Sequence, residues 1–407
     1  MNILFLSQLL PFPLDAGPKV RSYYVLRQLA LTHHVTLLAF TRESDTQESI
    51  DHLKTFCEAV ITIPVKRSRF NNIWALLLSW VSGQPFLITR DQSRQMTEAI
   101  GRITRQQDFD FVHADQLWMA KYALKAKSEL MKRGIPPRLV LDQHNAVFQI
   151  PERMAENTDR WVPRQLLRGE SGVMAKFERD ICQKFDDVVW VTQEDLHAVT
   201  SHASREASDK IQEISRVIPI CVEPQGRHSD GLSTSRDILF LGGMHWPPNA
   251  EGIVWFCKNV FPSIHKLVPD VKLLAIGKSP PKYICDMDGV EAPGYVDHTE
   301  PYWRKARVFV VPLLSGGGMR VKILDAWAHG VPVISTSIGA EGMRYQDGQD
   351  ILISDQPEKM IEQVIHLLNQ SDRATQISNA GLAALEKYYD WRVVYKDWDH
   401  IYHVKNS

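Results

Sequence analysis

The sequence predicts an α/β protein made of two doubly wound domains, each with a parallel β-sheet covered by helices. Three observations lead to this prediction. The chain has 407 residues, too many for one ordinary hydrophobic core and suitable for two domains. Short β-branched runs alternate with longer amphipathic stretches, as expected for parallel strands buried on both faces. A polar stretch near the middle interrupts this alternation, which then starts again.

The first half of the chain contains short apolar runs that we expect to form strands. They lie at residues 3–6, 35–40, 59–65, 111–114, 138–142, 188–192 and 217–220. Amphipathic stretches, such as residues 20–31 and 172–185, separate these runs and are expected to be helices. Alternation of strand and helix predicts a parallel sheet with helices on both faces.

The polar stretch at residues 223–237 is rich in Gly, Ser and Asp, which is typical of a linker or an exposed loop. After it, strands are expected at residues 237–241, 271–276, 289–296, 308–313, 331–335 and 351–354. Residues 384–404 are aromatic and helical in pattern. We therefore expect four parts: a first domain at residues 1–222, a linker at 223–236, a second domain at 237–384 and a C-terminal helix at 385–407.

Composition and charge exclude several classes of protein. The chain is 44% hydrophobic and 23% charged, which is ordinary for a globular protein and excludes a disordered or fibrous one. Lys and Arg number 47 against 48 Asp and Glu, and this balance disfavours a nucleic-acid-binding protein. The five cysteines include no Cys-x-x-Cys pair, so neither a disulfide framework nor a zinc finger is predicted.

The chain begins with no basic region of a secretory signal and holds no apolar run long enough for a membrane span, so we expect a cytoplasmic protein. One segment starts at Lys66 and ends at Val81. It joins a basic cluster to an apolar, Trp-bearing stretch. Such a segment suits a peripheral contact with the inner face of a membrane, and it equally suits a core helix with a solvated basic entry.

Ligands of doubly wound sheets bind beyond the carboxyl ends of the strands, so the loops there hold the candidate site residues. The first such loop leads into a helix at Gly17, where exposed backbone N–H groups favour an anion. Lys19 and Arg21 add positive charge. The loop lacks the dinucleotide and P-loop glycine patterns, and a plain strand-to-helix turn is the alternative.

A second loop carries the strongest signal. Three successive glycines, Gly316, Gly317 and Gly318, follow a strand and precede a helix, which indicates close approach of backbone to a ligand. Met319 follows, and then Arg320 and Lys322 stand in the first helical turn, where cations oppose the helix dipole unless an anion is bound. Asp325, about one turn later, is placed to bind a ribose diol, as acidic residues do in nucleotide sites.

Two more loops complete the candidate set. Gly243 belongs to a glycine pair after the first strand of the second half; Trp246 follows, and Asn249 can cap the next helix. In the first half, His144 stands just past a strand end, and Asp115 ends a neighbouring His-Ala-Asp string. A histidine at a strand's carboxyl end is better placed for chemistry than one on a core face.

These motifs resemble those of the GT4-type, retaining glycosyltransferases of the GT-B fold. The resemblance is strongest at residues 237–246, 294–296 and 312–342, and the glycine strings resemble the exopolysaccharide and cell-envelope subgroup. It implies two Rossmann-like domains facing across a cleft and a C-terminal helix that crosses back to the first domain. It also implies transfer of a sugar from a nucleotide-diphosphate sugar, with UDP expected, and neither a metal nor another cofactor.

The resemblance also implies roles for individual residues. Asp325 takes the place of the family carboxylate that binds the ribose, whereas Gly317 stands where the family normally has a Glu that contacts the donor sugar. Arg320 and Lys322 are expected to neutralise the diphosphate, and His144 to hydrogen-bond the donor sugar. The donor and nucleotide set further includes Gly17, Gly243, Trp246, Tyr295, Val296, Gly316, Gly318, Met319 and Glu341. The acceptor side is expected to include Lys19, Arg21 and Asp115.

Three Asp-x-Asp strings, beginning at Asp108, Asp286 and Asp397, fit solvated surface better than a divalent-metal site. The expected acceptor is a glycan, a lipid-linked glycan or a small molecule. A sugar-nucleotide epimerase of the same fold and a non-catalytic two-lobed binding protein are the alternative functions.

Overall fold

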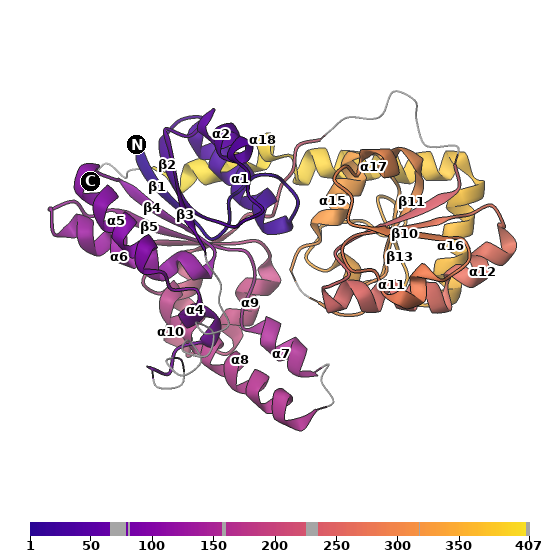
Figure 1. Ribbon diagram of the computed structural model, residues 1–407, viewed down its shortest axis with the longest axis horizontal. Helices are drawn as coiled ribbons and strands as arrows, with labels where there is room; N and C mark the ends of the chain where they lie inside the picture. The colour runs from indigo at the N-terminus through magenta and orange to yellow at the C-terminus, as the bar shows by residue number, and fades with distance from the viewer. Residues whose placement is uncertain (66–78, 80–81, 157–159, 225–234, 317, 404–407) are drawn as a thin grey trace. The chain divides into compact units, whose positions relative to one another are not determined.

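The computed structural model describes residues 1–65, 79, 82–156, 160–224, 235–316 and 318–403 (Figure 1). The chain divides into two compact units. Unit 1 comprises Met1–Ile220 and Val394–Ser407, and unit 2 comprises Cys221–Val393. Most of the expected linker, most of the segment from Lys66 to Val81, and Gly317 lie outside the described residues.

Unit 1 contains a parallel sheet in the order β3-β2-β1-β4-β5-β6-β7. Its strands are β1 (Asn2–Ser7), β2 (His34–Thr41), β3 (Ala59–Pro64), β4 (Phe111–Asp115), β5 (Arg138–Gln143), β6 (Asp187–Trp190) and β7 (Ser215–Val217). The strand order reverses between β1 and β4, which is where doubly wound sheets bind ligands.

The helices of unit 1 pack on both faces of this sheet (Figure 1). They are α1 (Gly17–Ala30), α2 (Gln47–Lys54), α4 (Phe86–Arg90), α5 (Arg94–Gln106), α6 (Ala120–Met131), α7 (Gln149–Glu156), α8 (Trp161–Cys182), α9 (Gln193–Ser201) and α10 (Arg205–Glu213). Helix α8 begins eleven residues before the stretch predicted from the sequence. The added turns bury few apolar side chains, so hydrophobic periodicity could not reveal them.

Unit 2 contains a second parallel sheet, in the order β10-β9-β8-β11-β12-β13. Its strands are β8 (Asp237–Leu241), β9 (Leu273–Ile276), β10 (Val290–Gly294), β11 (Ala306–Val311), β12 (Val333–Ser335) and β13 (Leu352–Ile353). Its helices are α11 (Pro247–Asn259), α12 (Phe261–Leu267), α13 (Lys282–Cys285), α14 (Glu300–Lys305), α15 (Val321–Ala328), α16 (Pro357–Asn369), α17 (Ser371–Tyr388) and α18 (Trp391–Val394).

The strand predicted at residues 217–220 is displaced. The observed β7 ends at Val217, because Pro219 has no N–H group to continue the ladder. The carbonyls of Ile218 and Pro219 accept hydrogen bonds from the side chain of Arg21 instead. The carbonyls of this irregular segment therefore belong to a side-chain network, while the Ile218 N–H still donates to the Trp190 carbonyl of β6 at 2.9 Å.

The expected single C-terminal helix at residues 385–407 is wrong. Helix α17 ends at Tyr388, and Asp390 then forms an isolated bridge with Val222. The carboxylate of Asp390 accepts the backbone N–H of Arg392 at 2.9 Å, which starts α18 as a separate helix.

The chain then continues as a 3₁₀ helix, η3 (Tyr395–His400), which belongs to unit 1. The side chains of Tyr395 and Trp398 in η3, and of Tyr402 just after it, are fully buried, and the Arg21 guanidinium lies 5.5 Å from the Trp398 ring centroid. The last turns of the chain thus complete the core of unit 1. None of the helices in the described ranges has the length and apolar character needed to span a membrane.

Replacing Trp398 by alanine is expected to lower the free energy of unfolding of unit 1 by about 3–5 kcal/mol, because it leaves a cavity where an indole was fully buried. Urea unfolding followed by circular dichroism measures the change. The control is Lys396→Ala, an exposed position of the same 3₁₀ helix, which should change the free energy by less than about 0.5 kcal/mol. Equal midpoints for the two variants would contradict this packing.

Candidate functional site

The first candidate site lies at the carboxyl ends of β1, β4 and β5 in unit 1. Asp115 ends β4, and its Oδ2 accepts hydrogen bonds from the hydroxyls of Ser7, at 2.7 Å, and Ser22, at 2.8 Å. Its Oδ1 lies 2.8 Å from Nε2 of His144, which follows β5. Asp115 is fully buried, so it acts on a ligand only through His144.

Arg21 occupies the centre of this region. Its Nε and Nη2 donate to both carboxylate oxygens of Asp142, at 2.6–2.9 Å, and its Nη1 donates to the carbonyls of Ile218 and Pro219. The side chain is 0% exposed. The expectation that Arg21 faces an acceptor is therefore wrong, because its guanidinium is a structural cation held by Asp142, Ile218 and Pro219 of unit 1.

The charge state of His144 follows from these neighbours. Burial disfavours its protonated form, yet the Asp115 and Asp142 carboxylates prevail and raise the pKa of His144 to about 8. Burial likewise opposes ionisation of Asp142, but Arg21 and His144 hold its pKa well below its ordinary value. The imidazole is thus mainly protonated at pH 7. Its Nδ1 is buried and has no hydrogen-bond partner among the described residues.

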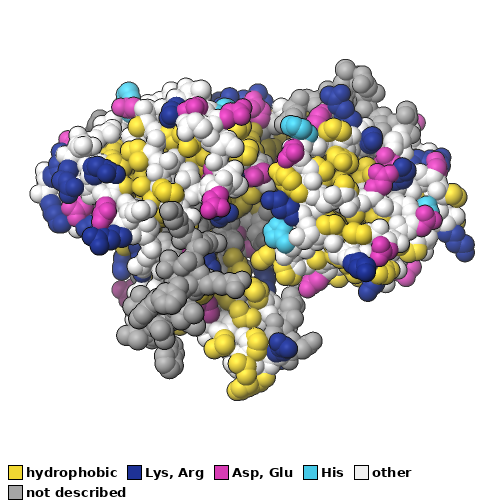
Figure 2. Space-filling view, in the orientation of Figure 1, with side chains coloured by type: hydrophobic (Ala, Val, Ile, Leu, Met, Phe, Trp, Pro, Cys, Tyr) yellow, Lys and Arg dark blue, Asp and Glu magenta, His cyan; other side chains and the backbone are white. Residues whose placement is uncertain are grey.

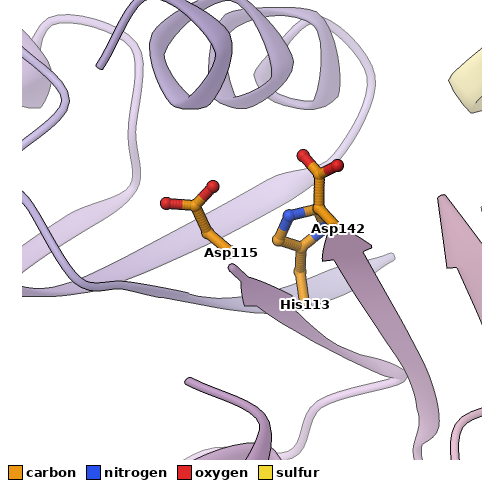
Figure 3. Close-up of side chains that lie close together, drawn as sticks. All are labelled: His113, Asp115 and Asp142. Atoms are coloured by element: carbon orange, nitrogen blue, oxygen red, sulfur yellow. The ribbon is translucent and has the colours of Figure 1, made fainter. Parts of the chain in front are cut away.

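His113, Asp115 and Asp142 form a group that could hold a metal ion, with their candidate ligand atoms within 4.8 Å of one another (Figure 3). The protein's own groups already occupy most of these atoms. Arg21 bonds both oxygens of Asp142, and the Tyr402 hydroxyl lies 2.6 Å from Nδ1 of His113. Burial lowers the pKa of His113 to about 4, which keeps it neutral. The donor set therefore fits a buried ion-pair cluster better than a metal centre.

The loop that carries His144 is held by two buried acids that the sequence analysis missed. Glu178 of α8 accepts hydrogen bonds from the backbone N–H groups of Val147 and Phe148 and from the Gln143 amide. Burial raises the pKa of Glu178 to about 8. Asp195 of α9 accepts the N–H of Ala146 at 2.8 Å. The only sequence signal was an acidic residue at a core position of an amphipathic stretch.

The remaining predicted residues of unit 1 lie at the start of α1. Gly17 is the first residue of that helix, as the sequence predicted for its entry loop. Lys19 is largely buried and forms ion pairs with Asp15, at 3.0 Å, and Asp45, at 3.8 Å. Its charge is thus partly neutralised by the unit itself.

The second candidate site lies in unit 2, where the glycine loops after β8 and β11 meet. Lys322 Nζ donates to Asn249 Oδ1 at 2.9 Å, and the Asn249 amide donates to the carbonyl of Gly243 at 3.0 Å. A side chain at Gly242 would place its Cβ 2.8 Å from Lys322 Nζ, so this glycine makes room for the lysine. Asn249 lies inside α11 and does not cap it; its side chain links the two loops instead.

The loop before α15 depends on glycine for its conformation. Gly316 has φ +112° and Gly318 has φ +77°, values that L side chains rarely adopt. A Cβ at Gly316 would lie 3.0 Å from an Arg320 Nη atom. Arg320 occupies the N-cap position of α15 without a side-chain capping bond, and Met319 before it is buried, so the loop brings the Arg320 side chain beside the backbone of Gly316.

Lys322 and Asp325 stand one turn apart on α15, and both are half-buried. Burial, together with the charge of Arg320, lowers the pKa of Lys322 to about 7, and Asp325 offsets part of that effect. Burial raises the pKa of Asp325 to about 7, against the effect of Lys322. Two titratable groups poised near neutrality beside a glycine loop are typical of a functional site.

Other predicted residues lie on the surface of unit 2. Tyr295 follows β10 and is 56% exposed, with Lys278 Nζ 4.6 Å from its ring centroid; Val296 follows it and is half-buried. Trp246 precedes α11 and is 44% exposed. Glu341 follows the 3₁₀ turn η2 (Ile338–Ala340). Nothing in the described contacts ties these four directly to Lys322.

Comparison with known proteins gives this second site its context. Residues 235–370, which include the glycine loops, Lys322 and Asp325, match the family described as "Glycosyl transferases group 1". The chain is a glycosyltransferase.

Solved structures confirm the predicted GT-B fold of the glycosyltransferase. Anabaena HepE in complex with UDP-glucose has a TM-score of 0.67 at 10% identity, with coverage of 98% of this chain and 99% of that one. TarM of S. aureus, in complex with UDP among other ligands, has a TM-score of 0.66 at 11% identity, covering 99% and 100%. At such identities the similarity concerns the fold.

Two protein relatives extend the comparison. A protein of the cps region of Klebsiella pneumoniae is 20% identical over 416 residues, spanning 97% of the glycosyltransferase and 98% of its own length. It agrees with the predicted exopolysaccharide subgroup. A phosphatidyl-myo-inositol mannosyltransferase of Mycobacterium leprae is 22% identical over 194 residues, covering 42% of this chain and 50% of that protein.

The Asp115 contact predicts a pH dependence of stability. The folded pKa of His144, about 8, exceeds the unfolded value of about 6.5. The stability gained from its protonation is complete below pH 6.5 and is lost as the pH rises through 8. In Asp115→Asn the His144 pKa should fall, and the free energy of unfolding should change less between pH 6 and 9. NMR titration of the imidazole and urea unfolding measure both effects.

The matched control is Asp108→Asn, an exposed carboxylate of the same unit. It should leave the His144 titration unchanged. An unaltered His144 pKa in Asp115→Asn would show that the 2.8 Å contact does not set the charge of the ring.

Proposed function

We propose that the protein transfers a sugar from UDP-sugar to a glycan or lipid-linked acceptor, with retention of anomeric configuration and without a metal ion. The observation that carries this proposal is the cluster in unit 2 where Lys322 and Arg320 lie beside glycine backbone. The reaction expels a nucleoside diphosphate, whose developing negative charge must be stabilised. Fixed cations next to bare backbone suit that task.

Lys322 is the principal group in this mechanism. Asn249 and the Phe240 ring, whose centroid is 5.0 Å from Nζ, hold the ammonium in place before any ligand binds. Its pKa of about 7 means that burial makes the charge costly in the unliganded site. A bound diphosphate would offset that cost and keep Lys322 protonated as the sugar–phosphate bond breaks. Arg320 would supply a permanent second charge.

Asp325 is assigned to the nucleoside. A carboxylate one turn into the helix can accept hydrogen bonds from both ribose hydroxyls. Burial holds its pKa near 7, so binding of the two hydroxyl donors would favour the ionised form. Tyr295, Val296 and Trp246 are proposed to line the nucleotide pocket, and Glu341 to face the sugar ring.

His144 is assigned to the transferring sugar. Its Nε2 is fixed by Asp115, so the Nδ1–H of the protonated ring is the group that can donate to a sugar hydroxyl. Gly17, at the start of α1, is proposed to let backbone approach the donor phosphates or the acceptor.

The named ligands of similar proteins support the choice of substrates. HepE was solved with UDP-glucose, and the similar trehalose-phosphate synthase of Burkholderia vietnamiensis is UDP-forming. The cps-region relative and the phosphatidyl-myo-inositol mannosyltransferase support an envelope glycan or lipid-linked acceptor. A cytoplasmic location, and a membrane contact through the segment from Lys66 to Val81, remain predictions from the sequence.

The defining experiment incubates the protein with a panel of nucleotide sugars, with and without candidate acceptors and with EDTA. Release of UDP that depends on an acceptor, and that persists in EDTA, is expected. NMR of the product should show the anomeric configuration of the donor. Inversion, or activity only with a divalent ion, would overturn the corresponding part of the proposal.

Lys322→Ala should lower kcat by about 10²–10³-fold, because it removes a fixed charge from the departing diphosphate. Steady-state kinetics with the active donor measures the effect. The control is Lys258→Ala, an exposed lysine of α11, which should retain full turnover. Near-normal kcat in Lys322→Ala would remove this lysine from the mechanism.

Asp325→Ala should weaken UDP binding by about tenfold or more while affecting kcat at saturating donor less, since the ribose contact is made before and during transfer. Isothermal titration with UDP measures the affinity. Asp286→Ala, an exposed aspartate in the same unit, is the control. Unchanged affinity in Asp325→Ala would refute the ribose assignment.

A further inference from the structure

Helices α7 and α8 form an antiparallel pair that projects from the sheet of unit 1 (Figure 1). The C-terminal half of α8 is packed into the unit, with Met174, Glu178 and Cys182 buried. Its N-terminal half extends away from the sheet. The described part of this hairpin is residues 149–156 and 160–182.

The projecting part exposes large apolar side chains. Trp161 and Leu166 are each 71% exposed, and Val162 is 58% exposed. Met154 of α7 and Val173 further along α8 are exposed as well. Figure 2 shows hydrophobic side chains gathered on this projecting lobe. Single exposed apolar residues are common, but a gathering of this kind marks an interaction site.

The exposed apolar residues of α8 share one face of that helix. At 100° per residue, Trp161, Val162, Leu166 and Val173 fall within an arc of about 140°. The buried residues of the same helix lie on the opposite side. The exposed stripe is therefore a second apolar face, which the packing of unit 1 does not use. A side of a helix with Trp, Leu and Val facing water lowers solubility unless something covers it.

The charges beside the stripe indicate what covers it. The charged residues from position 160 to 169 are Arg160, Arg164 and Arg168, with no acid among them. The described acids of the hairpin lie on α7, at Glu152 and Glu156, and from Glu170 onward on α8. Pairing of this stripe with a second copy would bring arginines toward arginines. A surface of anionic lipids attracts them, and tryptophan favours the interface between water and acyl chains.

We propose that the N-terminal half of α8, centred on Trp161 and Leu166, docks on a membrane surface that contains anionic lipid. Trp161, Val162 and Leu166 enter the interfacial layer, and Arg160 and Arg168 contact lipid phosphates. This contact is distinct from the segment between Lys66 and Val81 and does not depend on the proposed sugar transfer.

The position of the docking face has a functional bearing. Helix α7 begins at Gln149, five residues after His144, and Glu178 near the other end of α8 holds the loop that carries His144. The docking face and that loop are thus parts of one continuous loop–helix structure. A lipid-linked acceptor at the membrane would therefore lie near the element that carries His144.

The test is co-sedimentation of the full-length protein with vesicles of phosphatidylcholine containing about one-third phosphatidylglycerol. The native chain should bind, and vesicles of phosphatidylcholine alone should bind it at least about tenfold less. The double variant Trp161→Ser/Leu166→Ser should lose binding by about tenfold or more. Arg160→Gln/Arg168→Gln should weaken binding to anionic vesicles and reduce its salt dependence.

The matched control is Leu31→Ser/Leu267→Ser, which removes two exposed leucines elsewhere in the chain and should leave vesicle binding unchanged. Circular dichroism and UDP titration confirm that every variant is folded, and they report on the proposed donor site separately from vesicle binding. Full binding by the Trp161→Ser/Leu166→Ser variant would overturn the proposal and place the contact elsewhere. A second result would also overturn it: the native chain does not bind vesicles and forms a dimer in sedimentation velocity, and the Trp161→Ser/Leu166→Ser variant is monomeric.

Discussion

The guanidinium of Arg21 is fully buried, and a charge in that position is tolerable only while its donors have partners. Those partners come from three places: the Asp142 carboxylate on β5, the carbonyls after β7, and the ring of Trp398 near the end of the chain. Helix α1, two strands and the C-terminal segment are thereby joined at one cation. The same carboxylate then contributes to the charge of His144, so the core and the candidate site share one electrostatic network.

In unit 2 the main constraint is the close approach of Lys322 to the backbone at Gly242. Gly242 leaves room for Lys322, and a Cβ at Gly277 would lie only 2.0 Å from the Gly242 carbonyl. A side chain at Gly277 would therefore collide with the end of β8. Asn249 fills the remaining gap and fixes the ammonium. Steric limits and not charge pairs set this geometry. This explains why glycine stands at positions 242 and 277 of the sequence.

The alternation of strands and helices could be predicted because buried parallel strands leave an unmistakable apolar pattern, as at residues 308–313. The glycine loop and Lys322 could be singled out because three successive glycines, which stabilise neither helix nor strand, stand directly before two cations. The partners of the buried charged residues could not be predicted in this way. The structural role of Arg21 is not predictable, because a sequence does not reveal that Asp142, 121 residues away, neutralises its charge. The role of Glu178 could not be predicted, because a sequence pattern does not distinguish a buried acid from an exposed polar residue of a helix. The start of α8 was missed because its apolar residues face outward.

Helix α8 has a consequence that lies in its length. Seventeen residues separate Trp161 from Glu178, which at 1.5 Å per residue is about 25 Å of unbroken helix. A straight helix resists compression, so it acts as a spacer of fixed height. Its length fixes the separation between the exposed tip and the loop of His144. If α8 docks on a membrane as proposed, this separation would limit how far from the lipid surface the reactive end of an acceptor can lie, and selection by length would need no contact with the sugar itself.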